Sequence, residues 1–113
     1  RPHEIEFKNV EFEIAAYGII ALQTVLPLLL KAGLDASQIA EKLAINPRTI
    51  LGMTAPVIEK GAEANFTVYH PTEEWTFNAA NNLSKSANSP LLNQKLTGKV
   101  KLVYNNKQSQ SYG

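Results

Sequence analysis

The feature that most constrains the fold is the run from Ala15 to Lys31, AAYGIIALQTVLPLLLK, in which nearly every side chain is apolar. A helix that is apolar all round is buried in protein or in a membrane. Gln23, Thr24 and Pro27 interrupt the run, which is already shorter than the roughly 20 apolar residues that a bilayer span needs. We therefore expect a core segment enclosed by protein on all sides, and no membrane span.

Two helical arrangements of this run agree with the sequence. In the first, Thr24 caps a helix that carries Pro27 in its first turn, where a missing N–H does no harm, and Gly33 closes the helix in a left-handed conformation. In the second, a longer helix begins near Ile19 and is kinked at Pro27.

Composition limits the classes of function. A chain of 113 residues with 44% hydrophobic content can bury one modest core, which favours a single domain. A net charge of +1 with scattered Lys and Arg argues against nucleic-acid binding. The absence of cysteine excludes disulfides and thiolate chemistry and fits a reducing, cytoplasmic compartment. No signal peptide opens the chain, and its start at Arg1 without Met suggests the remainder of a longer protein.

Two short helices are predicted after Gly33. Asp35 and Gln38 form a capping-box pattern at the start of a helix over Ala36–Ala44. Leu34 and Ile39 should pack together as a hydrophobic staple at its start. Its buried face should consist of Ile39, Ala40 and Leu43. In the second helix Asn46 is the cap, Pro47 takes the first helical position and Gly52 ends it, with Ile45 and Ile50 as a staple.

The rest of the chain has the character of strands and loops. Residues 1–16 alternate imperfectly, which suggests an extended or looping segment. Three strands are predicted by alternation: Phe66–Tyr69, Glu74–Phe77 and Lys99–Tyr104. A long polar connection covers Asn81–Gln94, and the tail KQSQSYG has no core role. Three such strands leave unpaired edges, so we expect association beyond the monomer, as a homo-oligomer.

The order of several short motifs resembles the C-terminal part of a dihydroorotase of the amidohydrolase superfamily. In the first half these are His3, Lys8, Glu11-Phe12, Tyr17-Gly18-Ile19-Ile20, Leu22-Gln23-Thr24, Asn46-Pro47 and Ile50-Leu51-Gly52. In the second half they are Lys60 to Asn65, Glu74-Trp75-Thr76-Phe77, Ser84 to Pro90 and Leu96 to Val100. The resemblance spans almost the whole chain in unbroken order, and the Ser84 to Pro90 run is its most specific part.

This resemblance implies an α+β fragment of a larger fold. Residues 1–55 would be the last loop and helices of a (β/α)8 metal-dependent hydrolase barrel. Residues 56–113 would be the C-terminal strands of a small β-sandwich built from both ends of the chain. Partners for the three predicted strands would then come from the rest of the protein.

The resemblance also implies a reaction, the reversible hydrolysis of a cyclic amide between dihydroorotate and N-carbamoyl-aspartate in pyrimidine biosynthesis. Such enzymes use zinc and a catalytic Asp, and the Asp would lie just upstream of Arg1. His3, Tyr17 and Gly18 match positions that bind the small-molecule substrate. The chain holds no His-x-His pair, so we expect no metal ligands, no bound zinc and no activity from this segment alone.

Some residues depart from the family's pattern. The family usually has Gly-Leu-Glu-Thr where this chain has Ala21-Leu22-Gln23-Thr24, and Ala-Asp where it has Ala64-Asn65. A hydantoinase or allantoinase, or a non-catalytic dihydroorotase-like interaction module, are the alternative functions. Among other residues, His70 is expected at the surface at a strand end and Lys85 in a solvated loop, while Trp75 and Phe77 are expected in the core.

Overall fold

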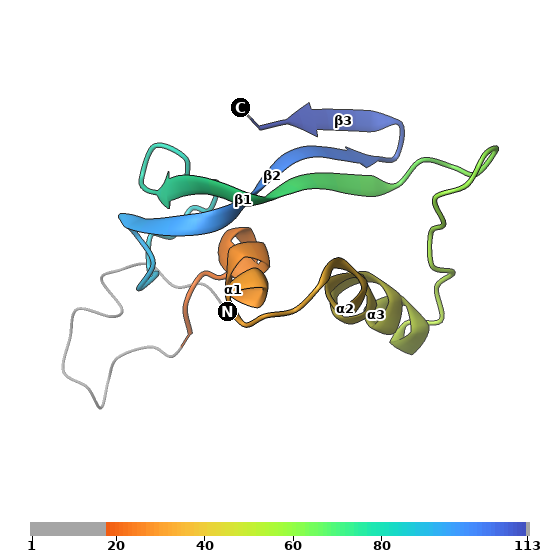
Figure 1. The fold of residues 1–113 in the computed structure, drawn as a ribbon, viewed down its shortest axis with the longest axis horizontal. Helices are drawn as coiled ribbons and strands as arrows, with labels where there is room; N and C mark the ends of the chain where they lie inside the picture. The colour runs from red at the N-terminus through yellow and green to blue at the C-terminus, as the bar shows by residue number, and fades with distance from the viewer. Residues whose placement is uncertain (1–17, 113) are drawn as a thin grey trace.

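The computed structural model describes residues 18–112 as helices followed by an antiparallel sheet. Helical elements come first: η3 (Leu22–Thr24), α1 (Val25–Lys31), α2 (Ala36–Ala40), η4 (Glu41–Ile45) and α3 (Asn46–Ile50). The strands follow: β1 (Phe66–Phe77), β2 (Gln94–Asn105) and β3 (Gln108–Ser111). In Figure 1, α1 lies against one face of the sheet, whereas α2 and α3 lie to one side of α1. The expected α+β composition is therefore confirmed.

Helix α1 follows the first of the two predicted arrangements. Thr24 is its N-cap and Pro27 lies in its first turn, preceded by the single 3-10 turn of η3, so the kinked longer helix is wrong. The Thr24 hydroxyl does not cap the helix; it donates instead to the carbonyl of Ala21 at 3.1 Å. Gly33 has φ +89°, and the N–H groups of Gly33 and Leu34 donate to the carbonyls of Leu30 and Leu29, which is a Schellman ending.

The predicted enclosure of this apolar run is wrong for residues 18–31 within this chain. Ile20, Thr24, Leu26 and Pro27 are buried, but Leu22 is 90% exposed and Ile19 is 51% exposed. One side of the run therefore packs on the sheet and the other faces outward. The segment has the composition of a fully buried element, but the rest of residues 18–112 covers only one of its sides.

The two predicted helices form one continuous helical run over residues 36–50. Asp35 and Gln38 make the predicted capping box, in which each residue's side chain accepts from the other's backbone N–H. Asn46 is not a cap, because its φ of −61° and ψ of −44° are helical. Its N–H donates to the Glu41 carbonyl five residues back, and this wider π-helical turn lets the helix pass Pro47, which has no N–H to donate.

The apolar face predicted for this run is also mostly uncovered. Ile39 is buried as expected, whereas Ala40 is exposed and Leu43 is 45% exposed, so those two predictions are wrong. Gly52 ends the run as predicted, with φ +71° and a second Schellman pattern, in which Gly52 and Met53 donate to Thr49 and Arg48.

Two of the predicted strands are a single strand. β1 runs through Pro71 and pairs with β2 in an antiparallel register from Phe66 opposite Tyr104 to Phe77 opposite Gln94. The register shifts between His70 and Glu74, so Pro71 lies in a bulge, where its missing N–H breaks no ladder bond. The prediction of two separate strands over Phe66–Tyr69 and Glu74–Phe77 is therefore wrong.

The polar tail forms a strand that the sequence pattern did not predict. β3 pairs with β2 from Leu102 opposite Ser111 to Asn105 opposite Gln108. Asn106 and Lys107 connect the strands with φ values of +50° and +60°, which match the type I′ turn favoured in two-residue hairpins. All four residues of β3 are exposed, so the tail has no core role, as predicted.

The core is small and lies between the start of the described chain and the sheet. Ile20, Phe77 and Leu96 form its buried cluster, and Trp75, Leu91 and Leu92 pack against it. The rings of Trp75 and Phe77 meet edge to face with centroids 6.2 Å apart. Trp75 and Phe77 thus have the packing roles expected of them. Among the helices of residues 18–112, none has the length and apolar character that a bilayer crossing requires.

Gly98 of β2 lies beside Leu30 and Pro27 of α1, and replacing it with alanine should destabilise the fold. Its φ is +103°, and an added Cβ would lie 2.5 Å from Leu30 Cδ1. We expect Gly98→Ala to lower the free energy of unfolding by about 2 kcal/mol, because left-handed backbone strain adds to the cost of moving the Leu30 methyl group; urea denaturation measures the loss. Gly52→Ala is the matched control, because Gly52 also has positive φ but open space around it; it should cost about 1 kcal/mol. Equal losses would contradict the packing argument.

Candidate functional site

Of the three residues that the sequence predicts to bind substrate, Gly18 lies in the part of the chain that the structure describes. His3 and Tyr17 lie outside the described residues. Gly18 is exposed and opens the segment that leads to the buried Ile20 and on to α1. Gly18 and its contacts therefore make up the described part of the predicted site.

The main chain beside Gly18 is bonded to the long loop between β1 and β2. The side-chain amide of Asn88 donates through Nδ2 to the Gly18 carbonyl at 2.8 Å. The backbone N–H of Ile20 donates to the Asn88 carbonyl at 3.0 Å. Asn88 thus holds two consecutive peptide groups from one position.

Gln23 makes a second pair of bonds to the same loop. Its Nε2 donates to the Asn81 carbonyl at 2.6 Å, and its Oε1 accepts from the Leu83 N–H at 2.9 Å. A primary amide can donate and accept at once, and both of its ends are used here. We call these four bonds, two at Asn88 and two at Gln23, the clasp.

The loop that makes the clasp is itself ordered by asparagine side chains. Asn81 Nδ2 donates to the Thr76 carbonyl at 2.7 Å, and Asn82 Nδ2 donates to the Ser86 carbonyl at 2.9 Å. Ser86 is buried, and its hydroxyl accepts from the Asn88 N–H at 3.2 Å. These bonds replace sheet pairing, so the loop of residues 78–93 has a defined conformation at the clasp.

Sequence reasoning identified the long connection but not its function as the partner of Gly18. The signal was present in its composition, because asparagine recurs at positions 78, 81, 82, 88 and 93. Asparagine favours turns in which its side chain bonds nearby backbone groups. Such a density predicts an ordered loop, but it does not reveal which distant segment the loop will contact.

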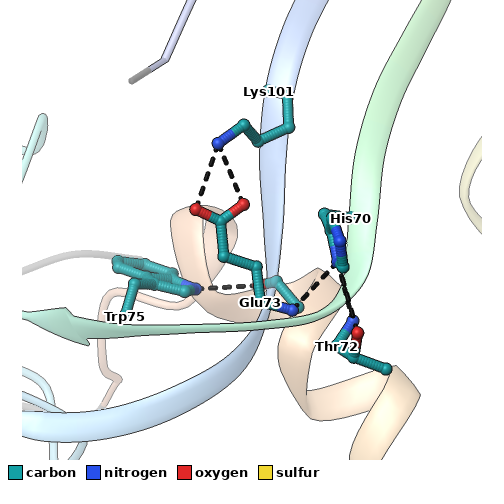
Figure 2. A network of polar contacts seen from close by, with 6 residues as sticks. His70, Thr72, Glu73, Trp75 and Lys101 are labelled. Carbon is teal, nitrogen blue, oxygen red and sulfur yellow. Dashed lines mark hydrogen bonds and ion pairs between the residues drawn. The ribbon is translucent and has the colours of Figure 1, made fainter.

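A second polar network surrounds the bulge in β1 (Figure 2). His70 Nδ1 accepts from the N–H groups of Thr72 at 3.3 Å and Glu73 at 3.1 Å, so the ring shapes the bulge. The indole of Trp75 donates to the Gly98 carbonyl at 2.7 Å across the sheet. His70 is exposed, as predicted, but it lies within β1 and not at a strand end. This network has the character of a structural support.

Glu73 is held by a cation on the neighbouring strand. Lys101 Nζ lies 3.1 and 2.9 Å from the two carboxylate oxygens, and both side chains are about one-third exposed. The hydrogen bond from Lys101 lowers the pKa of Glu73; the effect of burial opposes this shift, while the charges of Lys101, Lys99 and His70 add to it. Because the folded-state pKa is depressed, this pair stabilises the fold above the ordinary pKa of 4.5 and the contribution is lost as pH falls through the folded value.

Glu73→Gln should therefore flatten the acid side of the stability profile. We expect the wild-type chain to lose more of its unfolding free energy than the variant between pH 6 and the acid limb near roughly pH 3. Thermal denaturation across this pH range measures the difference. Glu74→Gln is the control, because its partner Lys95 and Glu74 itself are more than half exposed and contribute little. Parallel profiles for wild type and Glu73→Gln would contradict the assignment.

The described residues do not fit a metal centre. Within residues 18–112, no group of three or more His, Cys, Asp or Glu side chains is placed to hold a metal ion. The one histidine in this range, His70, uses Nδ1 to accept from its own bulge. Residues 18–112 therefore offer no set of side chains that fits a metal ion.

Comparison with known proteins finds relatives of one name, dihydroorotase. No family model matches it. It is 44% identical over 101 residues to the dihydroorotase of Geotalea daltonii, a match that covers 86% of this chain and 24% of the relative. It is 41% identical over 103 residues to that of Geobacter sp. strain M21 and 40% identical over 104 residues to that of Acetivibrio thermocellus, each match covering 88% of this chain and 24% of the relative.

These relatives all carry the name dihydroorotase, so the matches confirm the resemblance that the motifs predicted. The chain corresponds in sequence to a dihydroorotase segment. It spans about a quarter of the length of these relatives.

Proposed function

We propose that this chain is the C-terminal segment of a cytoplasmic dihydroorotase, which interconverts dihydroorotate and N-carbamoyl-aspartate by hydrolysis of a cyclic amide bond. The observation that carries the proposal is the 40–44% identity over 86–88% of the chain to proteins of that name. The Ser84 to Pro90 run, which favours dihydroorotases over hydantoinases and allantoinases, lies in the loop that forms the clasp.

In this proposal, residues 1–55 complete a (β/α)8 barrel and residues 56–113 supply strands to a small β-sandwich. Uncovered apolar surface supports the membership of this segment in a larger fold. The large exposed side chains cluster on the second half of the helical run and just after it: Leu43, Ile45, Ile50, Leu51, Met53, Val57 and Ile58. The outer edge of β1, at the end of the β1-β2-β3 order, is the edge that further strands would extend.

The substrate-binding contribution of this segment is assigned to His3, Tyr17 and Gly18. The catalytic Asp belongs just upstream of Arg1, and zinc belongs to the barrel outside this segment. In this division the segment contacts substrate and the remainder of the protein performs the chemistry. An imidazole and main-chain groups can bond a carboxylate or a ring amide without a metal.

The test compares the complete protein with the 113-residue chain. We expect the complete protein to interconvert dihydroorotate and carbamoyl-aspartate, followed by the absorbance of the ring amide, and the 113-residue chain to give no turnover above buffer. Hydantoin and allantoin are assayed in parallel. Turnover of these substrates in place of dihydroorotate would refute the substrate assignment, and an inactive complete protein would favour the non-catalytic interaction module.

The exposed apolar surface also supports self-association of the isolated chain as a homo-oligomer. Leu22, Ile50 and Ile58 are each at least 84% exposed, which a soluble monomer rarely tolerates in such number. Light scattering after gel filtration measures the mass. A monodisperse species at the chain mass of 12.4 kDa would refute self-association.

A further inference from the structure

The geometry at Asn88 fixes the orientation of one peptide group next to the predicted site. Nδ2 of Asn88 lies 2.8 Å from the Gly18 carbonyl oxygen, so that carbonyl is directed at the loop. The Gly18–Ile19 peptide is trans, because no cis peptide bond is present among the described residues. In a planar trans peptide the C=O and N–H point in opposite directions. The N–H of Ile19 is therefore directed away from the loop.

The peptide group is also held at its far side. Ile20 is 7% exposed and packs with Phe77 and Leu96, and its N–H donates to the Asn88 carbonyl at 3.0 Å. Rotation of the Gly18–Ile19 peptide would break the Asn88 bond while leaving the Ile20 side chain anchored. The Asn88 side chain is thus the group that sets this rotation, and the Ile20 anchor sets the position.

We propose that Asn88 is a positioning residue, which holds the Gly18–Ile19 peptide so that its outward N–H binds an acceptor oxygen of the substrate. The proposal rests on the proposed function, and it extends the substrate-binding segment to Ile19 and to the loop of residues 78–93. Its chemical class of ligand is a carbonyl or carboxylate oxygen, which both dihydroorotate and carbamoyl-aspartate carry. Asn88 acts through the peptide and does not touch the substrate.

The test uses two isosteric variants of the complete protein. Asn88→Asp removes the donor to Gly18, because a carboxylate only accepts. Asn82→Asp is the matched control: it removes the donor to the Ser86 carbonyl in the same loop, adds the same charge and leaves Gly18 untouched. Asn88→Ala removes the donor without adding charge.

We expect Asn88→Asp and Asn88→Ala to raise KM about tenfold with kcat changed less than about threefold, the pattern of lost substrate binding. Asn82→Asp should keep KM within about twofold of wild type. We expect its thermal midpoint to fall by about as much as the thermal midpoint of Asn88→Asp. A KM unchanged in both Asn88 variants, or raised equally in Asn82→Asp, overturns the proposal.

Hydrogen exchange at residues 18–20 gives a second readout that needs no substrate. We expect the Ile20 amide to exchange about tenfold faster in Asn88→Ala than in wild type, since the peptide beside it loses its restraint. If the wild-type protein does not act on dihydroorotate, the proposed function fails. Hydrogen exchange then tests by itself whether Asn88 positions the Gly18–Ile19 peptide. Unchanged exchange in both Asn88 variants would then refute it.

Discussion

Phe77→Ala should lower the free energy of unfolding by about 3–5 kcal/mol, the largest loss that we expect from any single truncation within residues 18–112. Phe77 is 1% exposed, the most deeply buried large side chain among the described residues. Its ring contacts Ile20 from the start of the described chain and Leu96 from β2, so its removal leaves a cavity shared by three segments. Because small domains are stable by only about 5–15 kcal/mol, this loss removes a large fraction of the stability and should lower the urea midpoint markedly.

Phe66→Ala is the matched control for this prediction. It removes the same ring at the other end of β1, where Phe66 is only half-buried and stacks on Tyr104 with centroids 5.7 Å apart. A stacked cross-strand pair of this kind contributes about 1 kcal/mol. Urea denaturation followed by far-UV circular dichroism measures both variants. Comparable losses at the two ends of β1 would mean that the cluster around Phe77 is not the main core.

Local sequence signals predicted the local features of this fold. Asp35 and Gln38 form their capping box, and Gly33 ends α1 in a left-handed conformation. Each signal depends on atoms a few residues apart, so the surrounding fold has little influence on it. The alternation around Phe66–Tyr69 and Lys99–Tyr104 likewise identified residues that lie in strands.

The errors come from positions where a distant segment or a non-standard turn decides the outcome. Asn46-Pro47 has the composition of a helix start, but a π-helical turn accommodates the proline inside a continuous helix. Pro71 has the composition of a strand end, but the bulge opposite Gly98 keeps β1 in one piece. In both cases the backbone absorbed a missing N–H by widening locally, which residue preferences alone do not predict.

Burial was overestimated for a different reason. The run from Ile19 to Lys31 and the helical run over residues 36–50 carry more apolar surface than residues 18–112 can cover. A pattern of apolar residues predicts which positions are buried in the complete protein, even where a shorter stretch of that protein leaves them exposed. Exposed Leu22 and Ile50 are therefore evidence for covering elements elsewhere, in agreement with relatives about four times as long.

The candidate site was only partly predictable. Gly18 was predicted through the resemblance, and the structure adds Asn88 as its hydrogen-bond partner and Gln23 as a second contact to the same loop. Asn88 lies 70 positions from Gly18 in sequence, so no local pattern joins them. The family usually has Glu at the position of Gln23. In the clasp the Gln23 amide both donates and accepts a hydrogen bond, which a carboxylate cannot do.

Gln23→Glu, which restores the usual family residue, should destabilise this chain at neutral pH by about 2 kcal/mol. The carboxylate can still accept from the Leu83 N–H, but its second oxygen would face the Asn81 carbonyl where Nε2 now donates at 2.6 Å. Gln38→Glu is the matched control: the Gln38 side chain accepts through Oε1 from the Asp35 N–H, which a carboxylate also does, so its stability should change by less than about 0.5 kcal/mol.

The pH dependence of Gln23→Glu separates the loss of the donor from general damage to the loop. Only the protonated form of the introduced carboxyl group can donate to the Asn81 carbonyl, so folding must raise the pKa of this group above its ordinary value. A raised pKa means that the folded variant binds more protons, and its stability relative to wild type therefore increases as pH falls through that raised value. Urea denaturation of both proteins at several pH values measures this difference in stability. The pH dependence that Glu73 gives to both proteins cancels in the difference. A gap between variant and wild type that stays constant from pH 7 to the acid limb would show that Gln23 does not act as a donor to the loop.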